Sequence, residues 1–322
     1  MPRGDFILEG AEKVKWLSIA GALLLLQVQL PDNLSVNHRG QTIASVNRAD
    51  YKMIVFPLMD TGKFDQLTDE LERNIYRSPE NARLGDREEI VSEQVGYKLD
   101  RGKFEDQFFA YFFGKGSSAI EAPLKVLYPK VDSELLSDIR EKPIGHYATY
   151  FNSRNKNRSH NIALAAKAVN NTVVFPGEVF SFNQVVGIRT TEKGYLRAGV
   201  IVRGELSEGV GGGICQVSST LFNAIDRAGL KIVRRYSHSR NVPYVPPGRD
   251  ATVSWGGPDF SFQNQYDQPV LIRTFAGAGK MFVTIYSSDV IEYKPREVPG
   301  MSKRLPEETT TETDLKSPRS PE

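Results

Sequence analysis

The sequence predicts an α+β protein, in which helices mix with short strands and hairpins. Two segments, 64–76 and 214–228, repeat apolar residues at helical spacing. Short runs rich in valine, isoleucine and aromatic residues lie between turn signals such as Pro176-Gly177 and indicate short strands. This mixture of elements is typical of the α+β class. The chain has 322 residues, enough for one large domain or two ordinary ones.

The amino terminus contains the one membrane-like segment of the sequence, residues 16–30. About 15 apolar residues are short for a spanning helix and typical of a signal-peptide core. No small-x-small cleavage site follows before Pro31. We therefore expect residues 1–33 to comprise a cytoplasmic stub and an uncleaved signal-anchor, a single pass through the cell membrane with the bulk of the chain extracellular. The alternative is an amphiphilic or buried helix of a cytosolic protein, which two glutamines in the segment would suit.

Residues 34–143 are expected to form a smaller α/β module. Its clearest feature is a helix at 103–113, in which aromatic residues recur at helical spacing. Such a stripe is typical of a core, and the alternative is a groove for sugar rings or for a partner. Strands are also expected at 54–58, in the GYKLD segment that ends at Asp100, and at 122–128. Further helices are expected at 64–76 and 133–140.

Residues 144–295 are expected to form the second domain. Pro143 and Gly145 mark the boundary, and the residue composition changes after them. A helix is expected at 161–169, ended by the Asn170-Asn171 turn. Expected strands lie at 173–175, 179–182, 200–203, 231–236, 251–255, 260–262, 270–275 and 281–286. Residues 296–322 are mostly Pro, Thr, Glu and Ser, so we expect a disordered tail.

The segment from Gly209 to Ala228 holds the only cysteine of the chain, Cys215. Three glycines, Gly211–Gly213, precede it, and the apolar residues that follow fall at helical spacing. This pattern predicts a flexible loop that turns into a helix, with the thiol in the first turn. At about 100° per residue, Cys215 lies off the apolar side and shares its side of the helix with Ser219 and Phe222.

A thiol in the first turn of a helix is suited to nucleophilic chemistry. The first amide N–H groups of the helix are unpaired and carry partial positive charge, which stabilises a thiolate. The glycines let the backbone approach a bound group and can offer N–H donors to an oxyanion. The alternative is that Cys215 is a small buried residue, as free cysteines usually are.

A thiolate nucleophile normally needs a base, and the sequence contains four histidines. His238 is the first candidate, because a helix followed by a strand can return a residue to the level of the helix start. His160, just before a helix, is the second candidate. Asp250 or Asp259 would orient the imidazole, as in triads generally, and spacing singles out neither.

Other classes of ligand are not indicated. The net charge of +2 is too small to argue for nucleic acid, and no basic run is interleaved with aromatic residues. A single cysteine and scattered histidines lack the ligand spacing of zinc sites. The Gly211–Gly213 run lacks the lysine and the spacing of a phosphate loop. We expect no metal and no cofactor.

The sequence resembles the VanW-like family over residues 147–286. The matching runs are RSHNI at 158–162, FPGEVFSFN at 175–183, VGIRT at 186–190, GY at 194–195, GGGICQVSSTLFN at 211–223, HS at 238–239, YVPPGRDATV at 244–253 and DF at 259–260. Residues 88–140 resemble, more loosely, the peptidoglycan-binding module that often precedes VanW domains. The SHGC signature of the better-known L,D-transpeptidase fold is absent, so the motif differs.

The resemblance implies a bacterial envelope protein, and VanW domains are associated with L,D-transpeptidase activity on peptidoglycan. In that chemistry a cysteine attacks the carbonyl after the third residue of a stem tetrapeptide. The terminal D-Ala leaves, and an amine of a neighbouring stem resolves the thioester. Carried over to this chain, Cys215 is the nucleophile and His238 its base. The candidates for oxyanion or substrate binding are Gly212, Gly213, Arg158, Arg189 and Asp250.

Two hypotheses follow, with peptidoglycan stem peptides as the expected partner. In the first, the chain is a membrane-anchored cysteine transpeptidase that acts on peptidoglycan. In the second, it is a non-enzymatic wall-binding or assembly module in which Cys215 is structural. A third, a cysteine hydrolase of stem peptides, would use the same site with water as the acceptor.

Overall fold

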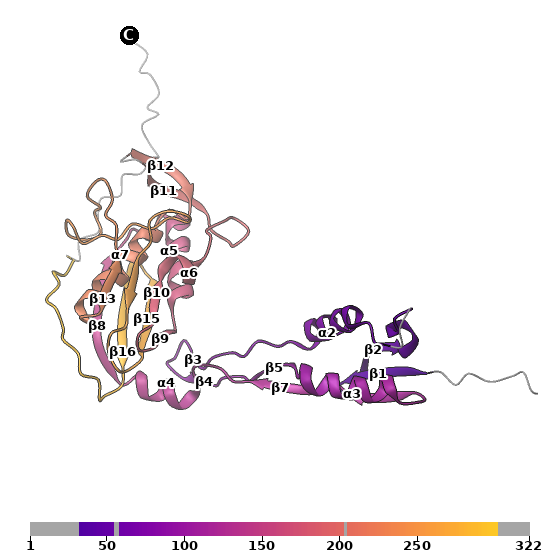
Figure 1. Ribbon diagram of the computed structural model, residues 1–322. Helices are drawn as coiled ribbons and strands as arrows, with labels where there is room; N and C mark the ends of the chain where they lie inside the picture. Colours follow the sequence, from indigo (N-terminus) through magenta and orange to yellow (C-terminus); the bar gives the residue numbers. More distant parts are fainter. Residues whose placement is uncertain (1–31, 55–57, 203–204, 302–322) are drawn as a thin grey trace, which may run out of the picture. The chain divides into compact units, whose positions relative to one another are not determined.

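The computed structural model describes residues 32–54, 58–202 and 205–301 (Figure 1). These residues form two compact units, the first made of residues up to 80 together with 94–129, and the second of 81–93 together with 130 onward. The expected signal-anchor at 16–30 lies outside the described residues. Within the described ranges, no helix is both long enough and apolar enough to pass through a bilayer.

The first unit packs helices against small sheets around an aromatic core. Its sheets have the orders β2-β1-β6 and β5-β7. Helix α3 begins where the Asp100 side chain accepts from the backbone N–H of Lys103, and four of its aromatic residues are buried. The aromatic stripe is therefore core. The elements are β1 (Asn33–His38), β2 (Gln41–Asn47), η1 (Arg48–Tyr51), α2 (Thr61–Ile75), β5 (Gly96–Leu99), α3 (Arg101–Phe113), β6 (Ser118–Glu121) and β7 (Leu124–Leu127).

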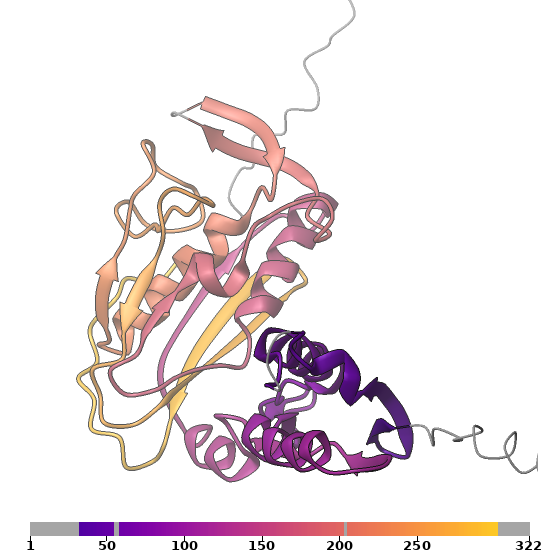
Figure 2. The ribbon, with the colours of Figure 1, turned by 45° about the vertical axis from the view of Figure 1, so that its right-hand side comes forward.

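The second unit is built on a four-stranded antiparallel sheet of order β8-β16-β15-β9. Its strands are β8 (Lys142–Tyr150), β9 (Thr172–Val174), β15 (Val270–Gly277) and β16 (Lys280–Ser287). Helix α5 (Lys156–Val169) packs against β15, and helix α7 (Ile214–Arg227) packs against β8 and β16 (Figure 2). The unit therefore combines helices with an antiparallel sheet, which confirms the α+β class.

Smaller elements of the second unit surround this sheet. A three-stranded sheet has the order β10-β14-β13, and β11 and β12 form a separate antiparallel hairpin. The elements are β3 (Arg83–Leu84), β4 (Ile90–Val91), α4 (Ser133–Ile139), β10 (Val179–Ser181), α6 (Phe182–Val186), β11 (Arg197–Val202), β12 (Glu205–Val210), β13 (Lys231–Arg234) and β14 (Ser261–Gln263).

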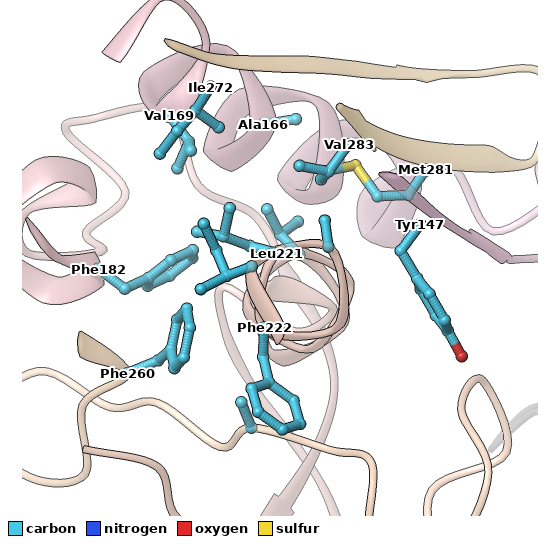
Figure 3. Packing of buried hydrophobic residues seen from close by; sticks show 14 of the residues in the cluster. Tyr147, Ala166, Val169, Phe182, Leu221, Phe222, Phe260, Ile272, Met281 and Val283 are labelled. Carbon is cyan, nitrogen blue, oxygen red and sulfur yellow. The ribbon is translucent and has the colours of Figure 1, made fainter. Parts of the chain in front are cut away.

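Helix α7 is buried on nearly every side. Its apolar side carries Val217, Leu221 and Ile225, all fully buried. Figure 3 shows Leu221 among the side chains of this core, with Phe222 on a different side of the helix near Phe260. Five buried residues of α7 are polar, and they are Gln216, Ser218, Ser219, Thr220 and Asn223. A buried polar side chain is stable only with hydrogen-bond partners, so these five side chains must meet polar groups.

Several expected elements differ from those observed. The segment 251–255 is irregular and not a strand, because the N–H of Ala251 bonds to the Ser219 hydroxyl instead of to a neighbouring strand. In the expected strand at 54–58, Ile54 and Leu58 are exposed bends, and 55–57 lie outside the described residues. Helix α5 starts five residues earlier than expected, since Asn155 caps it through the N–H of Arg158.

The compact units also divide the chain at other points than the expected boundary at 143/144. Strand β8 runs through that boundary, and residues 81–93 belong with the second unit. At the far end, the segment 296–299 is ordered up against α7, although a disordered tail was expected from 296. Arg227 donates to the carbonyl of Val298 at 2.6 Å, and the Tyr147 hydroxyl donates to that of Pro299 at 2.9 Å.

Shortening Leu221 to alanine should destabilise the second unit. Leu221→Ala removes a fully buried side chain from a packed core, which costs about 2–5 kcal/mol. We expect this loss in the free energy of unfolding when the protein is titrated with urea and unfolding is monitored by hydrogen exchange of peptides from α7. Val290→Ala, at a residue that is 68% exposed, is the control and should change stability by less than about 0.5 kcal/mol. Equal effects of the two substitutions would contradict the central position of α7.

Candidate active site

The glycine turn before α7 places the thiol of Cys215 in the first turn of the helix. Gly211 and Gly213 have φ values of +84° and +104°, a region that side-chain-bearing residues rarely adopt. Gly213 is the N-cap of α7 and provides no side-chain cap. Gly212 lies tight against β11, because a Cβ there would sit 2.5 Å from the carbonyl oxygen of Gly199. Each glycine is thus required by the turn itself.

Buried polar residues of α7 hold the loop at 249–253 against the helix. The Ser218 hydroxyl donates to the carbonyl of Ala251 at 2.5 Å, and the N–H of Ala251 donates to the Ser219 hydroxyl at 2.9 Å. Asn223 donates through its side-chain amide to the carbonyl of Arg249 at 2.8 Å. These bonds fix the residues on either side of Ala251, which are Asp250 and Thr252.

Asp250 and Thr252 meet His238 and Cys215 in one cluster. Asp250 Oδ2 accepts from both the backbone N–H and the ring Nδ1 of His238, each at 2.6 Å. With Nδ1 held in this way, Nε2 is the ring nitrogen left for Cys215, and the two side chains shift each other's pKa. The thiol also contacts the carbonyl of Val253 at 3.5 Å and the hydroxyl of Thr252 at 3.7 Å. Of the two aspartates considered from sequence, the structure brings Asp250 to the histidine.

The electrostatics of the cluster favour a thiolate–imidazolium pair. Burial alone would raise the pKa of the Cys215 thiol, but the hydrogen bond and charge of His238, with Val253 and Thr252, outweigh burial and lower it. Burial would lower the pKa of His238, but Cys215 and Asp250 raise it. Burial likewise opposes ionisation of Asp250, whose pKa is nevertheless lowered by His238. These opposite shifts in Cys215 and His238 favour transfer of a proton from sulfur to the ring.

A cavity of about 580 Å³ lies at the amino end of α7 and is lined by Cys215 and His238. Arg158 and Arg189 line the same cavity. The stem of Arg158 packs on Gly213, and its Nη2 donates to Gln216 Oε1 at 2.7 Å. The remaining walls come from the hairpin β11–β12, the glycine turn and the loop at 252–258. A thiol, an imidazole and two guanidinium groups therefore line one cavity.

The structure does not bring the other sequence candidates to this cavity. Gly212 is absent from its lining residues, since it contacts β11 and accepts a bond from Asn161. His160 is exposed on α5, with Nε2 2.9 Å from the carbonyl oxygen of Gly194. Asp259 accepts from the Ser181 hydroxyl and from the N–H of Asn183, at the start of α6. The remaining histidines are on strands, His146 on β8 and His38 on β1 in the first unit.

Three residues that support the site were not identified from sequence. Gln216 links Arg158 to the sheet, because its Nε2 donates to the Thr149 hydroxyl and to the carbonyl of Tyr150. Asn161 donates to the carbonyls of Leu196 and Gly212 and so anchors the glycine turn. Tyr244 lines the cavity, and burial followed by the charge of Cys215 raises its pKa, which keeps its hydroxyl protonated. Polar residues within the apolar helix α7 were the available signal for Gln216.

Comparisons with known proteins agree on one family. Residues 157–286 match the family described as VanW like protein. The chain is 59% identical over 297 residues to the Bacillus subtilis (strain 168) protein YoaR. This alignment covers 91% of this chain and 98% of YoaR. It is 33% identical over 117 residues to the vancomycin B-type resistance protein VanW of Enterococcus faecalis (strain ATCC 700802 / V583), over 35% of this chain and 42% of that protein. No solved structure matches the chain. The chain belongs to the VanW-like family.

Proposed function

We propose that the chain is a membrane-anchored envelope protein that acts on peptidoglycan as a cysteine acyl transferase of the L,D-transpeptidase type. The observation that carries this proposal is the Cys215–His238–Asp250 cluster, which faces a cavity at the start of a helix. A cysteine paired with a histidine, which is itself oriented by a third group, is the arrangement of an activated nucleophile. Similarity to a protein named for vancomycin resistance supports a substrate in the cell wall.

In the acylation step, the Cys215 thiolate attacks the carbonyl carbon of the peptide bond before the last residue of a stem peptide. A bond forms between Sγ and that carbon, and the carbonyl oxygen becomes an oxyanion. When the oxyanion collapses, the bond from carbon to nitrogen breaks. The proton on His238 Nε2 passes to the departing nitrogen, so that the last residue leaves as an amino acid and the acyl group remains as a thioester.

In the transfer step, the amine of a neighbouring stem attacks the thioester carbon. Neutral His238 takes a proton from this amine, the new amide bond forms, and the bond to Sγ breaks to restore the thiolate–imidazolium pair. Asp250 keeps Nδ1 protonated in both steps, because its Oδ2 accepts from that nitrogen at 2.6 Å. With water in place of the amine, the same steps would give hydrolysis.

The oxyanion requires N–H donors close to the sulfur. In the first turn of α7, the N–H groups of Ile214 and Gln216 donate to the carbonyls of Gly211 and Gly213. The N–H of Cys215 lies in the same turn, where the helix end carries partial positive charge. Gly213, the N-cap, lines the cavity and has no side chain to obstruct a substrate carbonyl. We assign oxyanion binding to the backbone N–H of Cys215.

The parts of the chain outside the second unit complete the proposal. Residues 1–33 would anchor the chain in the membrane as an uncleaved signal-anchor and leave the cavity on the outer side. The first unit would hold the chain on peptidoglycan. Both assignments follow from the sequence features of these segments.

The pKa shifts predict a thiol that reacts at a lower pH than an ordinary cysteine. As pH falls, an ordinary thiol loses its reactive thiolate near its usual pKa, whereas Cys215 should stay reactive below that point because its pKa is lowered. In His238→Ala, the main opposition to the effect of burial is lost, so the pKa of Cys215 rises and alkylation by iodoacetamide near neutral pH should slow by at least about tenfold.

The measurement is the alkylation rate of the folded protein as a function of pH, with His160→Ala as the matched control. His160 is exposed and outside the cavity, so its removal should leave the profile unchanged. A thiol in the wild type that resists alkylation until the protein is unfolded would show that Cys215 is structural.

Incubation with purified muropeptides that bear tetrapeptide stems should yield cross-linked dimers that have lost one D-Ala. Mass spectrometry should find these dimers with the wild type and none with Cys215→Ala, while His238→Ala should lower the rate by about a hundredfold or more. Release of D-Ala without dimers would identify a hydrolase. No product with the wild type, together with binding to sacculi that survives Cys215→Ala, would identify the non-enzymatic wall-binding module.

A further inference from the structure

Arg189 lines the cavity that holds Cys215, and one edge of its guanidinium has no hydrogen-bond partner within the described part of the chain. Its Nη1 donates to Asn183 Oδ1 at 2.8 Å. Its Nε and Nη2 are buried and have no hydrogen-bond partner within the described part of the chain. These two nitrogens share one edge of the guanidinium, where their N–H bonds run parallel and match the two oxygens of a carboxylate.

Neighbouring residues hold this edge in place. The Asn183 side-chain amide donates to the carbonyls of Ser254 and Pro258, at 2.9 and 3.1 Å, so its oxygen must face Arg189. The Arg189 guanidinium carbon lies 5.6 Å from the centre of the Phe182 ring. The stem of Arg189 passes Gly211, where a Cβ would lie 3.4 Å from Arg189 Cβ. The fork is therefore positioned before any ligand binds, which lowers the entropy cost of binding.

The charge of Arg189 is only partly compensated. Among the residues that the structure describes, its one hydrogen bond goes to the neutral side-chain amide of Asn183. Burial lowers the pKa of the guanidinium, an effect that Tyr195, Cys215 and Asp259 oppose, and an arginine remains charged in any case. A buried cation without a bonded anion is costly, so an anionic ligand that fits the fork is favoured.

Resting on the proposed acyl transfer, we propose that the Nε–Nη2 edge of Arg189 binds the free α-carboxylate of the residue that leaves during acylation. Arg189 and Cys215 line the same cavity, so we place the carboxylate on the residue that follows the scissile bond. The donor is then a peptide whose last bond is the one broken. Internal peptide bonds lack a carboxylate at this place and are poor donors.

Arg158, the other cation of the cavity, has a different task. Its Nη2 is bonded to Gln216 Oε1 at 2.7 Å, and its stem lies against Gly213, where a Cβ would be 3.0 Å from Arg158 Cγ. Arg158 thus braces the start of α7. Because Arg158 supports the start of α7, we assign carboxylate recognition to Arg189.

Binding to a protein that cannot react tests this assignment. Full-length Cys215→Ala is titrated by calorimetry with a stem tetrapeptide that ends in D-Ala and with the same peptide as its C-terminal carboxamide. We expect the free acid to bind at least about tenfold more tightly, as a charge-assisted bidentate pair requires. Adding Arg189→Gln should abolish this preference, and Arg189→Lys should keep part of it, because an ammonium retains the charge without the fork.

Arg234→Gln in the same background is the matched control, since Arg234 is an exposed arginine on β13, and it should retain the full preference. Equal binding of acid and amide, no binding of either, or a preference that survives Arg189→Gln would overturn the assignment. Because this measurement requires no reaction, its failure is distinct from that of the proposed function. An unreactive thiol in a protein that still prefers the acid would leave a carboxylate site in a non-catalytic protein.

Discussion

The candidate site depends on the hydrogen bonds between the polar side of α7 and the loop at 249–253. Ser218, Ser219 and Asn223 are fully buried, and each bonds to the backbone of that loop. The loop forms no strand ladder of its own at this point, so these side chains replace the ladder as the partners of its backbone. The same helix carries Cys215 at one end, and the same loop carries Asp250. One contact between helix and loop therefore sets how Cys215 and Asp250 lie relative to each other.

This arrangement explains why a core helix contains so many polar residues. Replacing one partner by an apolar residue would leave a buried N–H or carbonyl without a bond, which costs about 1–3 kcal/mol. Gln216 continues the pattern on another side of α7 by joining Arg158 to the Thr149 hydroxyl of the sheet. The apolar side, with Leu221, supplies the burial that offsets these demands. Stability and positioning of the site are thus distributed over different sides of one helix.

Sequence patterns predicted most of the regular elements of the second unit and the central geometry of α7. Helical spacing predicted that Cys215 shares its side with Ser219, and Ser219 is indeed the residue that bonds the loop beside Cys215. Spacing could not choose between Asp250 and Asp259, because that choice depends on how a loop folds back onto a distant helix. The segment 251–255 looked like a strand for the same reason. Ala251 and Val253 are buried but Trp255 is exposed, and the N–H of Ala251 bonds to the Ser219 side chain, which no local pattern reveals.

The single oxygen of Asp250 that accepts from both the backbone and the ring of His238 has a consequence for the order of events. Because Asp250 links the ring of His238 to the backbone N–H of the same residue, Nε2 has little freedom to turn toward a second position in the cavity. In the proposed reaction, the departing amine receives its proton from Nε2, and the arriving amine gives its proton to the same Nε2. They compete for one position, so the first product must diffuse away before the second substrate can enter. An imidazole held in one orientation therefore requires the acylation and transfer steps to occur one after the other.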